Sequence, residues 1–238
     1  GDPDFIKDKT SMLISDKYLR NRWKSYSPYL ATPSKEVGKI IQPNKQSEQT
    51  THLSIWDKFG NAVSVTTTLN DSYGAKTVVA GAGFLLNNDM DDFSIKPGVP
   101  NMYGAVGGEA NAISPNKRML SSMTPTIVTE KGKPYIIIGT PGGTTIPTSV
   151  FQAIVGIVDF KLTPSMAINA PKFHHQWLPE VVFTEKNFPK DTEEALEKMN
   201  YTIKKRGNIG RTEIIVIDEN GNINAVADSR GDDSVAAE

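Results

Sequence analysis

The sequence predicts a layered α+β fold, in which antiparallel sheet is covered on an outer face by helices. Two observations predict it: strands with alternating apolar and polar residues pair as hairpins, and the helical patterns cluster between those hairpins. The chain has 238 residues, of which 38% are hydrophobic and 22% charged, so it can bury a core. Sequence alone does not fix the topology.

Composition excludes several classes of protein. The net charge of −1 argues against a nucleic-acid groove, which would require a basic excess. The absence of cysteine excludes disulfides, thiol catalysis and thiolate metal sites. No apolar run approaches the roughly 18 residues of a membrane span. The chain begins GDPDF, without an initiator Met or a signal peptide, and we expect it to be a piece of a longer precursor.

Residues 1–49 differ in character from the rest. Thr10–Tyr26 has a loose helical spacing of apolar residues with basic residues between them. Residues 27–49 are rich in Pro, Ser, Lys and Gln, which predicts an exposed linker, where a chain is easily cut.

Strand patterns begin at Thr50. Residues 50–57 and 62–70 alternate on either side of a KFGN turn, which predicts a hairpin. A Gly-, Asn- and Asp-rich region follows from 71 to 117, and loops of this length are usually functional. Residues 124–143 predict a second hairpin, whose last strand runs into Gly142 and Gly143.

The helical patterns come next. Residues 148–160 predict a buried helix, and residues 163–171 a short one. Residues 191–201 predict a third, with Asp191 as N-cap and Glu194 completing a capping box. Residues 212–228 form the last predicted hairpin, and Asn220-Gly221 is typical of a type I′ turn.

Thr50 and Thr51 stand at the head of the first strand. A threonine hydroxyl is a poor nucleophile without a nearby base. His52 would share a strand face with Thr50, as would Ser54. Alternatively, cleavage between Gln49 and Thr50 would give Thr50 a free α-amine, with a reference pKa of about 7.7–8, that could take the proton itself. The remaining interpretation is an ordinary strand threonine.

Four other stretches could carry chemistry. Gly142-Gly143, after an apolar strand and before a helix, suits an oxyanion hole or a tight turn, whereas a phosphate cradle is disfavoured because no Gly-Lys-Ser/Thr follows. Ser121-Ser122 offers two donors to a carboxylate, or is an unremarkable turn. The acidic group of Asp89, Asp91 and Asp92 could bind an ammonium ion or a metal, or could simply face solvent. The pair His174-His175 does not favour a metal site, because adjacent side chains point in different directions.

Together these motifs resemble the γ-glutamyltranspeptidase family. They include GDPDF, TTHLSIWDKFGNAVSVTTTLN, GFLLNNDMDDFS, KPGVPNMYG, PNKRMLSSMTPTIV, GTPGG and NAPKFHHQWLP, in one order over nearly the whole chain. The resemblance implies an N-terminal-nucleophile hydrolase with an αββα sandwich, of which this chain supplies about half and a large subunit the rest. Residues 1–49 would be the C-terminal tail of the large-subunit segment with an exposed linker. Residues 50–238 would be the small-subunit catalytic domain, released by autocatalytic cleavage at Gln49–Thr50.

The resemblance also implies a role for each matching residue. Thr50 would be the nucleophile, and Thr68 would hydrogen-bond its hydroxyl. The substrate's α-amine would be held by Asn70 and Asp92, and its α-carboxylate by Ser121 and Ser122. The oxyanion donors would be Gly142 and Gly143, and Tyr103 would be a gating aromatic on a lid loop. Asp89 stands where the family usually has Gln or Glu, so it either reaches the amine through water or indicates a different substrate.

The activity implied is γ-glutamyl transfer or hydrolysis from glutathione-like γ-glutamyl amides, through a γ-glutamyl-Thr50 acyl-enzyme. Water or an acceptor amino acid or peptide would resolve that intermediate. The partner would be the large subunit of the same precursor, without which this fragment should be inactive. No cofactor, metal or nucleic acid is expected, and the location would be periplasmic or extracellular.

The alternatives within the fold are a poly-γ-glutamate depolymerase and a cephalosporin acylase. Asn70 and Asp92 favour a substrate with an α-amine over the acylase. A catalytically inactive binding module is the alternative of another class.

Overall fold

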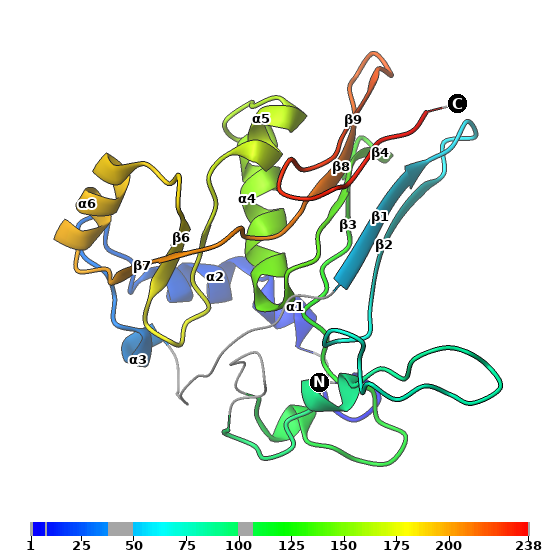
Figure 1. Ribbon diagram of the computed structural model, residues 1–238. Coiled ribbons are helices and arrows are strands. Elements are labelled where there is room, and N and C mark those ends of the chain that lie inside the picture. The colour runs from blue at the N-terminus through cyan, green and yellow to red at the C-terminus, as the bar shows by residue number, and fades with distance from the viewer. Residues whose placement is uncertain (1, 8, 38–49, 100–106, 238) are drawn as a thin grey trace.

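The computed structural model describes residues 2–7, 9–37, 50–99 and 107–237. Three layers follow one another in Figure 1. A hairpin of β1 (Thr50–Trp56) and β2 (Ala62–Thr68) forms one outer layer, and an antiparallel four-stranded sheet the middle one. The helices α4 (Ile146–Val158) and α5 (Pro164–Asn169) cover the other face of that sheet. The described residues therefore supply an αββ arrangement, as the α+β prediction requires.

The middle sheet has the strand order β3-β4-β8-β9. Its strands are β3 (Thr126–Glu130), β4 (Lys133–Gly139), β8 (Glu213–Ile217) and β9 (Ile223–Val226). Alternate residues of β4 and β8 face the helices, because side chains in a strand point to opposite faces in turn. The main core joins these residues to the buried faces of α4 and α5: Ile136, Ile138, Ile214 and Val216 with Val150, Ala153, Ile157, Ala167 and Ile168.

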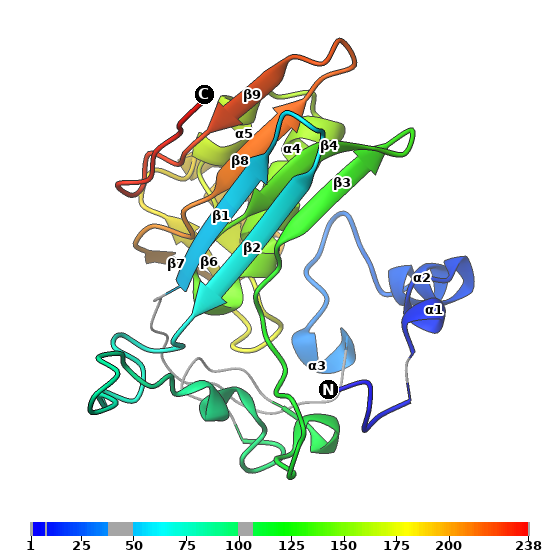
Figure 2. The same ribbon diagram turned by 90° about the vertical axis from the view of Figure 1, so that its right-hand side faces the viewer.

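The β1–β2 hairpin has an unusual distribution of side chains. Its inner face, toward the middle sheet, carries His52 together with hydroxyl residues such as Thr66. Ser64 Oγ on this face donates to the carbonyl of Ile138 at 2.9 Å. Its outer face is apolar and in view in Figure 2; its four apolar side chains are between 42% and 52% exposed: Leu53, Ile55, Val63 and Val65. Such a face is normally covered by another layer.

Two hairpins, β1–β2 and β8–β9, have the same type of turn. In the turn after β1, Gly60 has φ +86°, and Asp57 accepts hydrogen bonds from the backbone of Phe59 and Asn61. Asp218 does the same in the turn before β9, where Gly221 has φ +82°. Asn220 does not have a positive φ, so the predicted type I′ turn is wrong. The extra residue before the glycine makes a type I turn with a G1 bulge.

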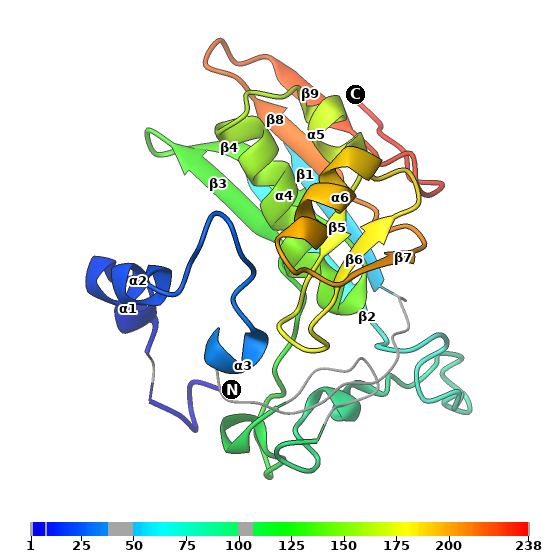
Figure 3. The ribbon, with the colours of Figure 1, turned by 90° about the vertical axis from the view of Figure 1, so that its left-hand side faces the viewer.

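Beside α4 lies a smaller sheet with the order β5-β6-β7, covered by α6 (Lys190–Lys198) in Figure 3. Its strands are β5 (Phe173–His174), β6 (Val182–Glu185) and β7 (Ile203–Arg206), and β6 and β7 run parallel. The predicted N-cap of α6 is wrong. The N-cap is Pro189, two residues before the predicted position, and Asp191 lies in the first turn of the helix.

The N-terminal segment departs from its predictions. The expected helix over Thr10–Tyr26 is split into α1 (Thr10–Leu13) and α2 (Asp16–Trp23), because Ser15 caps α2 by accepting from the backbone of Tyr18. The predicted linker contains α3 (Ser34–Val37), and Ser34 is buried. Its carbonyl accepts from Trp177 Nε1 at 2.7 Å. Within the predicted linker, Ser34 is therefore buried while Lys35 and Glu36 are exposed, and residues 38–49 lie outside the described part.

The long region after β2 contains the 3₁₀ turns η1 (Asp89–Asp92) and η2 (Glu109–Asn111). The first α-helix after it, α4, follows η3 (Gly143–Thr145) directly and begins two residues before its predicted start. Among the described residues, every helix is too short or too polar to cross a membrane.

Candidate active site

Thr50 lies directly opposite Thr68, because the two residues pair across the open end of the β1–β2 hairpin. Thr50 Oγ1 donates to Thr68 Oγ1 at 3.2 Å. Thr68 Oγ1 also accepts from the backbone N–H of Asn70 at 2.8 Å. The hydroxyl of Thr68 thus fixes both the side chain of Thr50 and the start of the chain after β2.

His52 is not placed to serve Thr50 as a base. Its Nδ1 lies 2.7 Å from Thr66 Oγ1 and its Nε2 3.1 Å from Ser54 Oγ, so both ring nitrogens are engaged. Burial lowers the pKa of His52 to about 4, which keeps the ring neutral. The ring lies against Gly139, where a Cβ would meet its Cε1 at 2.1 Å. His52 therefore fills the space between the sheets.

Asn70 connects β2 to the acidic turn. It adopts φ +73°, and its Nδ2 donates to the carbonyl of Asn88 at 3.1 Å. Asn88 Oδ1 accepts from the backbone N–H of Asp71 at 2.9 Å, and Asn88 N donates to the carbonyl of Leu69. Asn88 is also the N-cap residue of η1. It was not predicted as a site residue, although it is the second Asn of the NND stretch.

The acidic turn concentrates negative charge in a partly buried place. The pKa of Asp92 is raised to about 6, first by burial and then by the charges of Asp89 and Asp91. Burial also raises the pKa of Asp89, and its Oδ1 is buried without a hydrogen-bond partner among the described residues. A cation placed here would relieve both penalties, because it favours the charged carboxylates.

Asn111 fixes the serine segment to the acidic turn. Its Nδ2 donates to the carbonyl of Asp92 at 2.7 Å, and its Oδ1 accepts from the backbone N–H of Leu120 at 2.9 Å. Ser121 Oγ accepts from the backbone N–H of Met123 at 3.1 Å, and Ser122 Oγ donates to the carbonyl of Gly143 at 3.2 Å. Asn111 was missed by the sequence prediction, because a single Asn in a long loop gives no signal.

Gly142 and Gly143 form the strand–helix turn between β4 and α4. Gly142 has φ +138°, and a Cβ there would meet Thr145 Oγ1 at 2.6 Å, so a side chain is excluded. The carbonyl of Gly142 accepts from Thr145 N and Oγ1 at 3.0 and 2.8 Å. In a trans peptide the following N–H points the opposite way, so the N–H of Gly143 is directed away from Thr145.

A cavity of about 390 Å³ opens beside Thr50. Its lining includes Thr50, Thr68, Leu69, Asp71, Tyr73 and Arg211. Arg211 follows Gly210, and Gly210 in turn lies beside Gly142, where a Cβ would be 3.4 Å from its Cα. Gly142 and Gly143 themselves are not among the described residues that line the cavity. Arg211 was not predicted as a site residue.

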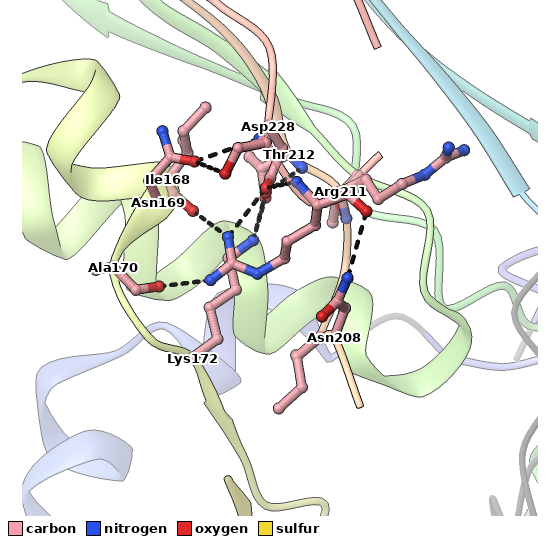
Figure 4. Close-up of polar contacts among 12 residues, drawn as sticks. Ile168, Asn169, Ala170, Lys172, Asn208, Arg211, Thr212 and Asp228 are labelled. Carbon is pink, nitrogen blue, oxygen red and sulfur yellow. Dashed lines mark hydrogen bonds and ion pairs between the residues drawn. The ribbon is translucent and has the colours of Figure 1, made fainter. Parts of the chain in front are cut away.

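A buried cluster of charges lies behind Arg211 (Figure 4). Lys172 Nζ and Asp228 Oδ2 are 2.8 Å apart, and Arg230 bonds both Asp228 and Glu185, at 3.0 and 2.6 Å. Glu185 Oε2 also accepts from the backbone of Lys172 at 2.8 Å. The cluster joins α5, the smaller sheet and the C-terminal segment, and its two positive and two negative charges balance.

The remaining predicted residues have simple outcomes. Gln49 and Tyr103 lie outside the described residues. His174 contacts Thr148 Oγ1 and Gln176 Oε1, at 2.8 and 2.9 Å. In the described ranges, no group of three potential metal ligands gathers in one place.

Two sheets that face each other, helices behind one of them, and a hydroxyl residue that begins the first strand of the other define an N-terminal-nucleophile hydrolase. Comparison with known proteins narrows this class. The family model described as Gamma-glutamyltranspeptidase matches residues 1–238, and the chain belongs to that family. It is 45% identical to the glutathione hydrolase proenzyme of Escherichia coli over 100% of this chain, yet spans only 41% of that protein's length.

Solved structures agree. A gamma-glutamyltranspeptidase from Pseudomonas nitroreducens complexed with L-DON matches with a TM-score of 0.74 and 46% identity, covering 79% of this chain and 99% of its own. A cephalosporin acylase from Bacillus halodurans matches with a TM-score of 0.81 and 26% identity, over 100% of this chain and 41% of its own.

Proposed function

We propose that the whole protein, of which this chain is part, transfers or hydrolyses the γ-glutamyl group of glutathione-like amides. The observation that carries the proposal is the 3.2 Å contact between Thr50 Oγ1 and Thr68 Oγ1 at the start of β1. The nearby imidazole of His52 contacts Thr66 and Ser54 instead of Thr50. The family and the name of the Escherichia coli relative supply the substrate class.

Cleavage between Gln49 and Thr50 would leave Thr50 with a free α-amine. That amine takes the hydroxyl proton as Thr50 Oγ attacks the γ-carbonyl carbon, and the N–H groups of Gly142 and Gly143 face the resulting oxyanion. The C–N bond then breaks, and the leaving amine takes the proton back. Water or an acceptor amine attacks the γ-glutamyl ester and frees Thr50.

The glutamyl end would be held by opposite charges. Asp92, with Asp89 beside it, offers the α-ammonium a partly buried carboxylate whose pKa is raised in the chain alone. Asn70 presents a side chain held by Asn88, and its Oδ1 accepts no hydrogen bond from the described residues. Ser121 and Ser122 would bind the α-carboxylate, and Tyr103 would lie over the bound substrate.

The proposed partner is a large subunit cut from the same precursor. The exposed apolar face of Leu53, Ile55, Val63 and Val65 supports this, because a fourth layer of helices would cover it. The Pseudomonas nitroreducens chain, nearly all of which is matched, covers 79% of this chain, the share that residues 50–238 make up. Residues 1–49 would then belong to the large subunit. We also propose a periplasmic or extracellular location.

A second candidate is an acylase that removes a glutaryl group, favoured by the TM-score of 0.81 to the Bacillus halodurans enzyme. A glutaryl group has no α-amine, so it would leave Asp92 and Asp89 unpaired. Comparing γ-glutamyl and glutaryl amides of one amine separates the two functions.

The experiment is to express the full-length protein with Thr50→Ala, Thr50→Ser or Thr129→Ala, the last on the exposed face of β3. Release of p-nitroaniline from γ-glutamyl-p-nitroanilide should vanish in Thr50→Ala, persist weakly in Thr50→Ser and match the unmodified protein in Thr129→Ala. Turnover by Thr50→Ala at the unmodified rate would refute the proposal. A fully processed protein that hydrolyses neither amide would indicate the inactive binding module instead.

A further inference from the structure

We propose that Arg211 forms a carboxylate subsite beside Thr50, which recognises the carboxylate on the amine side of the scissile γ-glutamyl amide. This inference rests on the proposed function and identifies its preferred substrates: amides in which the γ-glutamyl group is joined to an amino acid or a peptide. Arg211 is the one cationic side chain among the described residues that line the cavity of about 390 Å³ at Thr50.

The backbone of Arg211 is held firmly. Its N–H donates to Thr140 Oγ1 at 2.8 Å, at the end of β4. The preceding Gly210 has φ +66°, and a Cβ there would meet Thr140 Oγ1 at 2.8 Å and Ser149 Oγ at 3.0 Å. The hydrogen bond to Thr140 and the close packing around Gly210 together fix the turn that precedes the Arg211 side chain. A preorganised group loses little entropy on binding a ligand.

The guanidinium is oriented from behind by the C-terminal segment. Its Nη1 lies 3.1 Å from Asp232 Oδ1 and 3.7 Å from Asp233 Oδ1. Gly231 packs so closely on the side chain that a Cβ there would be 2.4 Å from Arg211 Cδ. In Figure 4 the side chain of Arg211 turns away from Lys172 and Asp228.

Part of the guanidinium remains available. Of its five N–H donors, only those on Nη1 are engaged by the described residues, which leaves Nε and Nη2. Two parallel N–H groups match the two oxygens of a carboxylate. The cavity therefore offers a forked donor to an anion next to the proposed nucleophile.

The glutamyl α-carboxylate is not the anion that Arg211 would bind. Its proposed partners, Ser121 and Ser122, belong to the segment joined to Gly143 and are not among the described lining residues of this cavity. The amine half of the substrate is what remains to be held there. Asp71 lines the same cavity with the opposite charge, so a free acceptor amino acid or peptide, which carries both an ammonium and a carboxylate, complements the two, whereas the γ-glutamyl amide itself presents only its carboxylate to Arg211.

The test measures kcat/KM of the full-length, processed enzyme for three donors: glutathione, glutathione esterified at its glycine carboxylate, and γ-glutamyl-p-nitroanilide. The ester comparison needs no variant, so it stands even where a substitution impairs processing. The variants are Arg211→Gln, and Lys58→Gln as a matched control. Lys58 is an exposed cation in the turn after β1, a strand that runs about 20 Å from Thr50 to Trp56.

The unmodified enzyme should use the ester about tenfold less well than glutathione, because a charge-assisted hydrogen bond is lost. Arg211→Gln should lose about tenfold on glutathione, become indifferent to esterification, and change less than twofold on the anilide, which has no such carboxylate. Lys58→Gln should match the unmodified enzyme throughout. Equal use of glutathione and its ester, or an equal loss on glutathione and the anilide in Arg211→Gln, would overturn the proposal.

Two further comparisons separate the sources of the carboxylate and the failure modes. Transfer to glycylglycine and to glycylglycinamide, with the anilide as donor, tests the acceptor: a preference for glycylglycine that Arg211→Gln removes supports binding of the acceptor as well as of the leaving group. No release from any donor by the unmodified enzyme would overturn the proposed function and this subsite together. Release from the anilide without discrimination of the ester would overturn the subsite alone.

Discussion

Replacing Thr68 with valine removes one hydroxyl and keeps the β-branched shape that suits strand β2. The hydroxyl of Thr68 accepts two hydrogen bonds, from Thr50 Oγ1 at 3.2 Å and from the backbone N–H of Asn70 at 2.8 Å. Each lost bond costs about 1 kcal/mol, and a donor left unpaired costs about 1–3 kcal/mol. If about 2–3 kcal/mol of this loss falls on the transition state, kcat decreases roughly 30- to 150-fold.

The assay is single-turnover acylation of the processed full-length enzyme by γ-glutamyl-p-nitroanilide, with self-cleavage of the precursor followed in parallel. Thr129→Val, on the exposed face of β3, is the matched control and should behave as the unmodified enzyme. An acylation rate of Thr68→Val within twofold of the unmodified rate would show that Thr68 does not position Thr50.

Three further predictions follow from the electrostatics. The kcat/KM of the processed enzyme for a γ-glutamyl donor should decline as the pH falls below about 6, because protonated Asp92 cannot pair with the ammonium of the substrate. The pH–rate profile of Asp92→Asn should lack this decrease on the acid side. Burial raises the pKa of Glu213 to about 8, above its unfolded value, so its contribution to stability is full below the unfolded pKa and is lost as the pH rises toward 8. Glu213→Gln should therefore raise the melting temperature more at pH 8 than at pH 4, and an equal shift at both would contradict this. Lys172→Met should destabilise the fold by about 3 kcal/mol in denaturant titrations, because Asp228 stays buried with only part of its charge compensated; a midpoint unchanged from the unmodified protein would exclude that role.

The sequence predicted the elements whose signals are local. Alternation over residues 50–57 and 62–70 predicted the β1–β2 hairpin, and the apolar run before Gly142 predicted β4 and the turn after it. The type I′ turn at Asn220 was wrong because the carboxylate of Asp218 stabilises a longer turn by accepting from the backbone of Asn220 and Asn222. The helix N-cap at Asp191 was wrong because Pro189 can precede a helix without a side-chain cap.

The features that sequence reasoning missed depend on distant partners. Lys172 pairs with Asp228 across 56 positions, and Asn111 holds segments on both sides of itself. Ser34 is buried because Trp177 donates to its carbonyl, 143 positions away. Arg211 reads as one more basic residue until the fold places it beside Thr50. Such contacts carry no periodicity, so only the three-dimensional structure reveals them.

The central claim is that Thr50 becomes an N-terminal nucleophile. Its most direct test is N-terminal sequencing and intact mass of the full-length protein after expression, followed by incubation with a γ-glutamyl donor. The account predicts a new terminus that reads Thr-Thr-His-Leu-Ser and a γ-glutamyl adduct on Thr50, both absent from Thr50→Ala. An unclipped chain with full turnover, or an adduct on another residue, would contradict it.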